Sequence, residues 1–98
     1  MTRAEQEHML REWIERRRAR TGSHNGIIGF GSKNVGPLRP VVPPTWLVDG
    51  ATIQLETSVL DVLVVNPEMC LVRGREFTHA VETELLVLHW WPIGETER

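Results

Sequence analysis

The 98-residue sequence is poor in cysteine, with Cys70 as its only one. A single cysteine excludes a disulfide bond within the chain, and it excludes a structural zinc site built on several cysteines. This scarcity is typical of proteins that stay in a reducing compartment. Within the apolar run MCLVR (69–73), we expect Cys70 to act as a small buried apolar group.

Long apolar runs are absent as well. The first twenty residues are charged throughout, which excludes the apolar core of a secretory signal peptide, and no run is long enough to span a bilayer. We therefore expect no secretion by a signal peptide and no insertion into a membrane. The expected location is the cytoplasm, or a complex that is assembled inside the cell.

The sequence has no complete catalytic or nucleotide-binding motif. Gly26 and Gly31 in GIIGFGSK have the spacing of a phosphate-binding loop, but Ser32 and Lys33 stand in the reverse order. A proline-rich stretch follows instead of the helix that such a loop requires. No serine lies in a G-x-S-x-G elbow. We therefore expect neither a cofactor nor an enzymatic activity.

Four histidines keep a metal-dependent or histidine-dependent enzyme as the least favoured alternative. His79, His89 and Glu84 could meet across strands, where they would hold zinc or transfer protons. Their spacing does not require such a site, because residues three apart on a strand, such as His79 and Glu82, point to opposite faces. We assign no catalytic or metal-binding residue from the sequence.

Residues 2–20 carry the strongest secondary-structure signal. Thr2 and Glu5 have the spacing of a capping box, and arginines gather toward the end, where they complement the helix dipole. A narrow apolar stripe is formed by Met9, Leu10, Trp13 and Ile14. We predict an N-terminal amphipathic helix over residues 1–21 that lies on the surface of a larger unit.

The following stretch, residues 22–45, is rich in glycine and proline. Residues 22–44 alone hold five of the eight glycines and four of the six prolines. Each proline biases the residue before it toward extended geometry, and no helical or strand period is sustained. We predict an extended arm or linker that becomes fully ordered only against a second surface. A polyproline ligand with two P-x-x-P matches is the less favoured interpretation.

After the arm the pattern becomes that of β-structure. Five segments have the alternation or the continuous apolar character of strands: 52–57, 59–65, 69–73, 75–82 and 84–91. The turns between them are too short for parallel crossovers. We predict an α+β fold in which residues 46–93 form a small antiparallel meander or barrel of four to five strands. A flexible tail is expected at residues 94–98.

Charge is unevenly distributed along the chain. Residues 1–45 carry a net charge of +4 and residues 46–98 a net charge of −6. The basic end could meet the acidic half, in the same chain or in a neighbour. It could also meet phosphates, which makes a nucleic-acid-binding barrel the alternative function. The candidate phosphate contacts are Arg16, Arg17, Arg18, Arg20 and Lys33.

Apolar strands and tryptophans favour contact with another protein. A sheet this small cannot bury both apolar faces of its strands away from water. Contact with another subunit would bury the face that remains exposed. Trp90 and Trp91 are adjacent, and on a strand they would face opposite sides. Tryptophan is also enriched at interaction hot spots. The candidate interface residues are Trp13, Phe30, Leu38, Trp46, Trp90 and Trp91.

These patterns together favour a non-enzymatic protein-interaction or assembly module. We expect an oligomeric accessory or structural component of a larger complex, such as a virion or another multi-subunit assembly. A small protein inhibitor fits nearly as well. The expected partner is another protein, a second copy of the chain, or both, with nucleic acid as the alternative partner.

Overall fold

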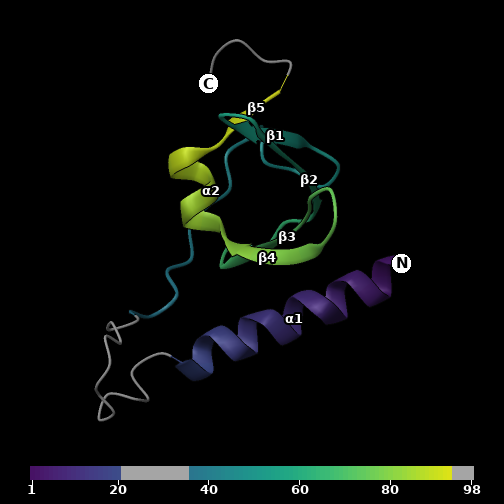
Figure 1. Ribbon diagram of the computed structural model, residues 1–98. Coiled ribbons are helices and arrows are strands. Elements are labelled where there is room, and N and C mark those ends of the chain that lie inside the picture. The colour runs from purple at the N-terminus through teal and green to yellow at the C-terminus, as the bar shows by residue number, and fades with distance from the viewer. Residues whose placement is uncertain (21–35, 94–98) are drawn as a thin grey trace, which may run out of the picture.

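The structure is a computed structural model that describes residues 1–20 and 36–93 (Figure 1). It has the predicted α+β architecture, with an N-terminal helix and a five-stranded antiparallel sheet of order β4-β3-β2-β1-β5. The elements are α1 (Arg3–Arg20), β1 (Thr52–Leu55), β2 (Ser58–Val64), β3 (Met69–Arg73), β4 (Thr78–Glu82), α2 (Thr83–His89) and β5 (Trp91–Pro92). The first four strands form a meander, and β5 returns beside β1 without closing the sheet.

Helix α1 begins as the sequence predicts. The Thr2 amide donates to Glu5 Oε1 at 2.7 Å, and the Glu5 amide donates to Thr2 Oγ1 at 3.1 Å. These reciprocal bonds complete the capping box and satisfy two amides that the helix leaves without partners. In Figure 1, α1 lies outside the curved sheet and passes alongside β4.

Two apolar clusters hold the fold together. The inner cluster lies within the curve of the sheet and contains Leu47, Ile53, Leu60, Val62, Cys70, Val72 and Leu86. The outer cluster joins the sheet to α1 and contains Leu10, Ile14, Val64, Met69, Leu71 and Ala80. Strand β3 alternates between the two clusters and is therefore covered on both faces. This explains its continuous apolar sequence.

The predicted strand over residues 84–91 is wrong. Residues 83–89 form α2, and only Trp91 and Pro92 form a strand. Leucine favours helices, and a short segment that is apolar at almost every position has no period to separate helix from strand. Helix α2 lies on the side that the sheet leaves open, between the ends of β4 and β5 (Figure 1). Its Leu86 completes the inner cluster.

The described part of the predicted arm lies against its own chain. Leu38 packs against the outer cluster, and the Val41 amide donates to the Pro67 carbonyl at 3.1 Å. Residues 22–35 of the arm and the tail at 94–98 lie outside the described residues. Of the described helices, none is both long and apolar enough to cross a membrane.

The basic helix meets the acidic module within one chain. Three ion pairs connect α1 to the sheet region: Arg3 with Asp49, Arg17 with Glu82, and Arg18 with Glu68. They lie near both ends of α1 and flank the outer apolar cluster. The uneven charge of the sequence is therefore matched, in part, inside the molecule.

Candidate protein-interaction groove

A groove of about 520 Å³ runs between α1 and α2 along β4. Its lining is mostly apolar, with charged groups contributed chiefly by α1. The lining residues are Trp13, Arg16, Arg17, Ala19, Arg20, Met69, Ala80, Val81, Glu82 and Leu85. We call this surface the α1–β4 groove. Clefts of this size and character commonly bind ligands or peptide segments.

The groove follows the edge of β4 rather than one of its faces. Three consecutive residues of the strand, 80–82, line it, although neighbouring side chains on a strand point to opposite faces. Strand β4 is the last strand of the sheet on this side, with β3 as its one neighbour among the described strands. A molecule in the groove would therefore lie beside the backbone of β4.

Arg17 has a structural role in the groove. Arg17 is 8% exposed, and its Nε donates to Glu82 Oε2 at 2.8 Å. Burying a guanidinium is favourable only when a carboxylate and hydrogen bonds replace its water. Arg18 pairs with Glu68 on the turn before β3. Two of the candidate phosphate contacts are therefore engaged in ion pairs within the chain.

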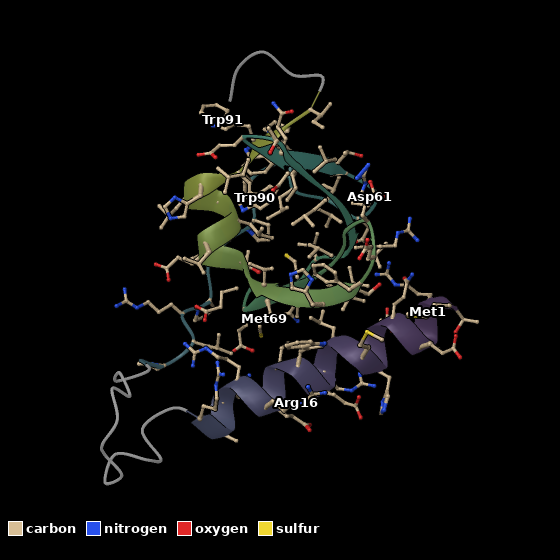
Figure 2. All side chains as sticks on the ribbon, in the orientation of Figure 1. Met1, Arg16, Asp61, Met69, Trp90 and Trp91 are labelled. Atoms are coloured by element: carbon tan, nitrogen blue, oxygen red, sulfur yellow. The ribbon has the colours of Figure 1, made fainter. Side chains whose placement is uncertain are left out.

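Arg16 and Arg20 present positive charge at the groove. Both residues are exposed, and within residues 1–20 and 36–93 neither forms an ion pair with a carboxylate. The Arg16 guanidinium lies 5.0 Å from the centre of the Trp13 ring, within range of a cation–π interaction. Figure 2 shows Arg16 on the C-terminal half of α1. The groove therefore carries an excess of positive charge beside an aromatic side chain.

His79 lies among aromatic rings beside the groove. Its ring centre is 4.8 Å from that of Phe77 and 6.5 Å from that of Trp13. Its Nδ1 is buried and has no hydrogen-bond partner among the described residues. Burial lowers the pKa of His79 below its usual value of about 6.5, so the imidazole is neutral at pH 7. A neutral ring packs well in this setting.

The predicted interface residues separate into buried and surface positions. Trp46 and Trp90 pack against the inner cluster, and Leu38 packs against the outer one. Trp91 is 49% exposed, and Figure 2 shows it directed away from the interior that Trp90 faces. Trp13 lines the groove. The two remaining candidates, Phe30 at the interface and Lys33 for phosphates, lie outside the described residues.

The structure does not assemble the histidine site that the sequence left open. His89 and Glu84 lie on α2, because the expected strand is a helix, whereas His79 lies on β4. Within the described ranges, no three histidine, cysteine, aspartate or glutamate side chains are placed to hold a metal ion. The three residues are therefore not brought together as the cross-strand group that the sequence analysis considered.

Cys70 occupies the position that the sequence predicts. It is fully buried in the inner cluster, and its Sγ lies 3.3 Å from Thr83 Oγ1. Burial raises the pKa of the Cys70 thiol, so the reactive thiolate is disfavoured. The Thr83 hydroxyl donates to the Asn66 carbonyl and ties α2 to the turn before β3.

From the sequence, Arg17 was named only as a phosphate contact, and Glu82 and Leu85 were not selected. Arg17 continues the helical stripe of Leu10 and Ile14 at spacings of four and three, so helical periodicity alone indicates that it faces the sheet. Glu82 and Leu85 gave no comparable signal. Their place in the groove depends on α2 beginning at residue 83, which the sequence pattern did not reveal.

The comparisons with known proteins identify no relative. No protein-family model, curated protein or solved structure matches this chain. The function must therefore be inferred from the geometry of the molecule itself. The α1–β4 groove brings Trp13, Arg16 and Arg20 to the edge of β4 and is the basis of the proposal that follows.

Proposed function

We propose that this chain is a non-enzymatic protein-interaction module that binds a segment of another protein in the α1–β4 groove. The observation that supports this proposal is the groove itself. It combines an apolar lining, the aromatic ring of Trp13 and two exposed arginines at the edge of a sheet. Aromatic and arginine side chains that converge on an apolar cleft are typical of protein-binding hot spots.

The same binding would make the chain an accessory component of a larger complex. By holding a segment of a partner, a small module can join a virion or another multi-subunit assembly, or can block the partner's own site as an inhibitor. Such an assembly would form inside the cell, in keeping with the expected cytoplasmic location. A second copy of the chain is the other protein that could supply the segment.

Ion pairing within the chain favours protein over nucleic acid as the partner. Binding to a phosphate backbone draws its affinity from several unpaired cations. Arg17 and Arg18 are already paired with Glu82 and Glu68. The remaining two arginines flank an apolar cleft, which suits a peptide that carries both acidic and apolar side chains.

Selection from a random peptide library tests the proposal. A phage library of random peptides is selected on the immobilised chain, and enriched peptides are measured on variants of α2. Leu85 lines the groove and Leu88 does not, although both are exposed on the same helix. We expect Leu85→Asp to weaken binding by about tenfold or more and Leu88→Asp to leave it unchanged.

Two results would overturn the proposed function. The first is a selection in which the wild-type chain enriches no peptide beyond the background seen with Leu85→Asp. The second is equal loss of binding in both variants, since the peptides would then bind elsewhere. Circular dichroism of each variant checks that α2 remains folded.

A further inference from the structure

The hydrogen-bond pattern of the β3–β4 ladder shows which backbone groups of β4 face the groove. Gly74 N donates to Phe77 O at 2.9 Å, and Thr83 N donates to Glu68 O at 3.1 Å, at the two ends of the ladder. In an antiparallel pair, hydrogen-bonded and non-hydrogen-bonded partners alternate. The register between these ends is continuous, so His79 and Val81 bond to β3.

The other three residues of β4 therefore direct their backbone outward. The amides of Thr78, Ala80 and Glu82 and the carbonyls of Thr78 and Ala80 face away from β3, on the side where the sheet ends. Glu82 is the N-cap residue of α2, so its carbonyl accepts the first hydrogen bond of that helix. Two of these residues, Ala80 and Glu82, line the α1–β4 groove. An extended peptide in the groove would thus find a row of donors and acceptors at the spacing of a strand.

Strand β4 lacks three of the features that commonly prevent pairing at a sheet edge, namely proline, lysine and a bulge. Its sequence THAVE contains no proline and no lysine, and its register with β3 is regular. By contrast, the β2–β3 register shifts between Val62 and Val64. Natural sheets commonly block exposed edges with proline, lysine or bulges. Edge β4 is therefore competent to accept a further strand.

The arginines of α1 define where acidic side chains would fall on that strand. Arg16 and Arg20 are four residues apart, which corresponds to about 6 Å along the helix. Alternate residues of a strand repeat every 6.6 to 6.8 Å, or roughly the same distance. Ala80 faces α1 because it packs in the outer cluster, and Glu82 faces α1 because it pairs with Arg17. Residues of the added strand that pair opposite Ala80 and Glu82 would therefore face α1 too.

The opposite face of the added strand would meet apolar groups. Val81 packs against the inner cluster and Leu85 is exposed on α2, and both line the groove. Residues that alternate with the acidic ones would point toward this side. The groove thus combines a basic side at α1 with an apolar side at α2.

We propose that the partner segment is an extended strand that pairs with the outward edge of β4 and alternates acidic with apolar residues. Two carboxylates, two residues apart, face Arg16 and Arg20, while the apolar residues contact Val81 and Leu85. This inference rests on the proposed function and specifies the chemistry of the bound segment. Main-chain hydrogen bonds supply part of the affinity, and the arginines supply the preference for acidic residues.

Three synthetic peptides labelled with fluorescein test the charge pattern. GVEVEVG has the proposed alternation, GVKVKVG reverses its charge, and GVVVEEG keeps its composition without the alternation. By fluorescence anisotropy, we expect GVEVEVG to bind about tenfold or more tightly than either control. The double variant Arg16→Glu/Arg20→Glu should reverse the preference toward GVKVKVG. Arg11→Glu, on α1 but outside the groove, should preserve it.

Amide hydrogen exchange by NMR tests the pairing itself. With GVEVEVG bound, exchange of the Ala80 and Glu82 amides should slow by about tenfold or more, because each gains a backbone acceptor. Exchange at His79 and Val81, which already bond to β3, should change little. This pattern distinguishes an added strand from a peptide that only lies in the groove.

The outcomes separate this inference from the proposed function. If library peptides require Leu85 but neither edge amide is slowed, strand addition is overturned and the interaction module stands. If GVVVEEG binds as well as GVEVEVG, the alternation is overturned. The chain could also form a dimer that Leu85→Asp dissociates, while GVEVEVG does not bind. That result would overturn a peptide of another protein as the partner and would favour a second copy of the chain.

Discussion

The two edges of the sheet differ in their capacity to accept another strand. At one edge, β5 has two residues, and the Ile93 amide donates to the Thr52 carbonyl at 3.0 Å. By alternation, the nitrogen of Pro92 faces away from β1 and carries no hydrogen. At the other edge, β4 has five residues and presents the outward amides of Thr78, Ala80 and Glu82.

This difference indicates that the β5 edge is protected against pairing with another strand and that the β4 edge is not. Proline at the outward position of an edge strand is a recognised means of preventing association. Edge β4 has no such protection, but it lies between two arginines of α1 and the exposed Leu85 of α2. An edge that is flanked by side chains able to select a partner is more consistent with specific binding than with a folding liability.

Proline substitutions along β4 would test this comparison with the largest expected effect. His79→Pro removes an amide that bonds to β3, so we expect the free energy of unfolding to fall by about 3 kcal/mol. Thr78→Pro removes only an outward amide, and we expect a loss of about 1 kcal/mol or less. Urea denaturation measures both. Equal losses would contradict the assignment of inward and outward amides.

The ion pairs beneath the β4 edge give the next largest expected effect. Glu82→Ala leaves the buried Arg17 guanidinium without its carboxylate, and we expect a loss of about 2 kcal/mol in unfolding free energy. The matched change is Glu68→Ala, since its partner Arg18 is well exposed and such pairs contribute about 0.2 to 1 kcal/mol. If the two variants unfold at the same denaturant concentration, Arg17 is not a structural residue.

Much of this fold could be predicted from sequence because local patterns determine most of its elements. The capping box of Thr2 and Glu5 and the apolar stripe identified α1, and alternation identified the segments that form β1 to β4. The strand predicted over residues 84–91 was wrong. In the structure Leu86 is buried while Leu85 and Leu88 are exposed, and this distribution is not visible in a sequence that is apolar at all three positions. This pattern reflects the helix bridging the open side of the sheet, a tertiary requirement that local propensity does not contain.

The candidate groove was less predictable, for a different physical reason. Trp13 and the arginine cluster are visible in the sequence, and helical periodicity places Arg17 toward the sheet, but the carboxylate that pairs with Arg17 is not visible. Arg17 is buried against Glu82 while Arg16, one residue earlier, is exposed. Which amides of β4 face outward depends on the hydrogen-bond register with β3, and one residue of slippage would reverse the assignment. Such information is present only once the strands are paired.

Amide exchange of the unbound chain would sharpen the comparison at single residues. The Ala80 amide faces outward, while the amides of His79 and Val81 bond to β3. We expect the Ala80 amide to exchange about tenfold or more faster than either neighbour, equivalent to about 1.4 kcal/mol in opening free energy. Heteronuclear NMR after transfer to D₂O measures the rates. Protection of Ala80 equal to that of His79 would mean that this edge is already covered.

The pH dependence of stability should provide the smallest effect, and it concerns the side chain of His79 beside the same edge. Burial lowers the pKa of His79 in the folded state, so the unfolded chain binds the proton more readily. The contribution of neutral, buried His79 to the free energy of unfolding is therefore complete above a pH of about 6.5. It is lost as the pH falls below that value, because the unfolded chain then takes up the proton first. We expect His79→Gln to flatten the fall in melting temperature between about pH 7 and pH 5. His8→Gln, on the exposed side of α1, should retain it, and an unchanged slope in His79→Gln would show that another group is responsible.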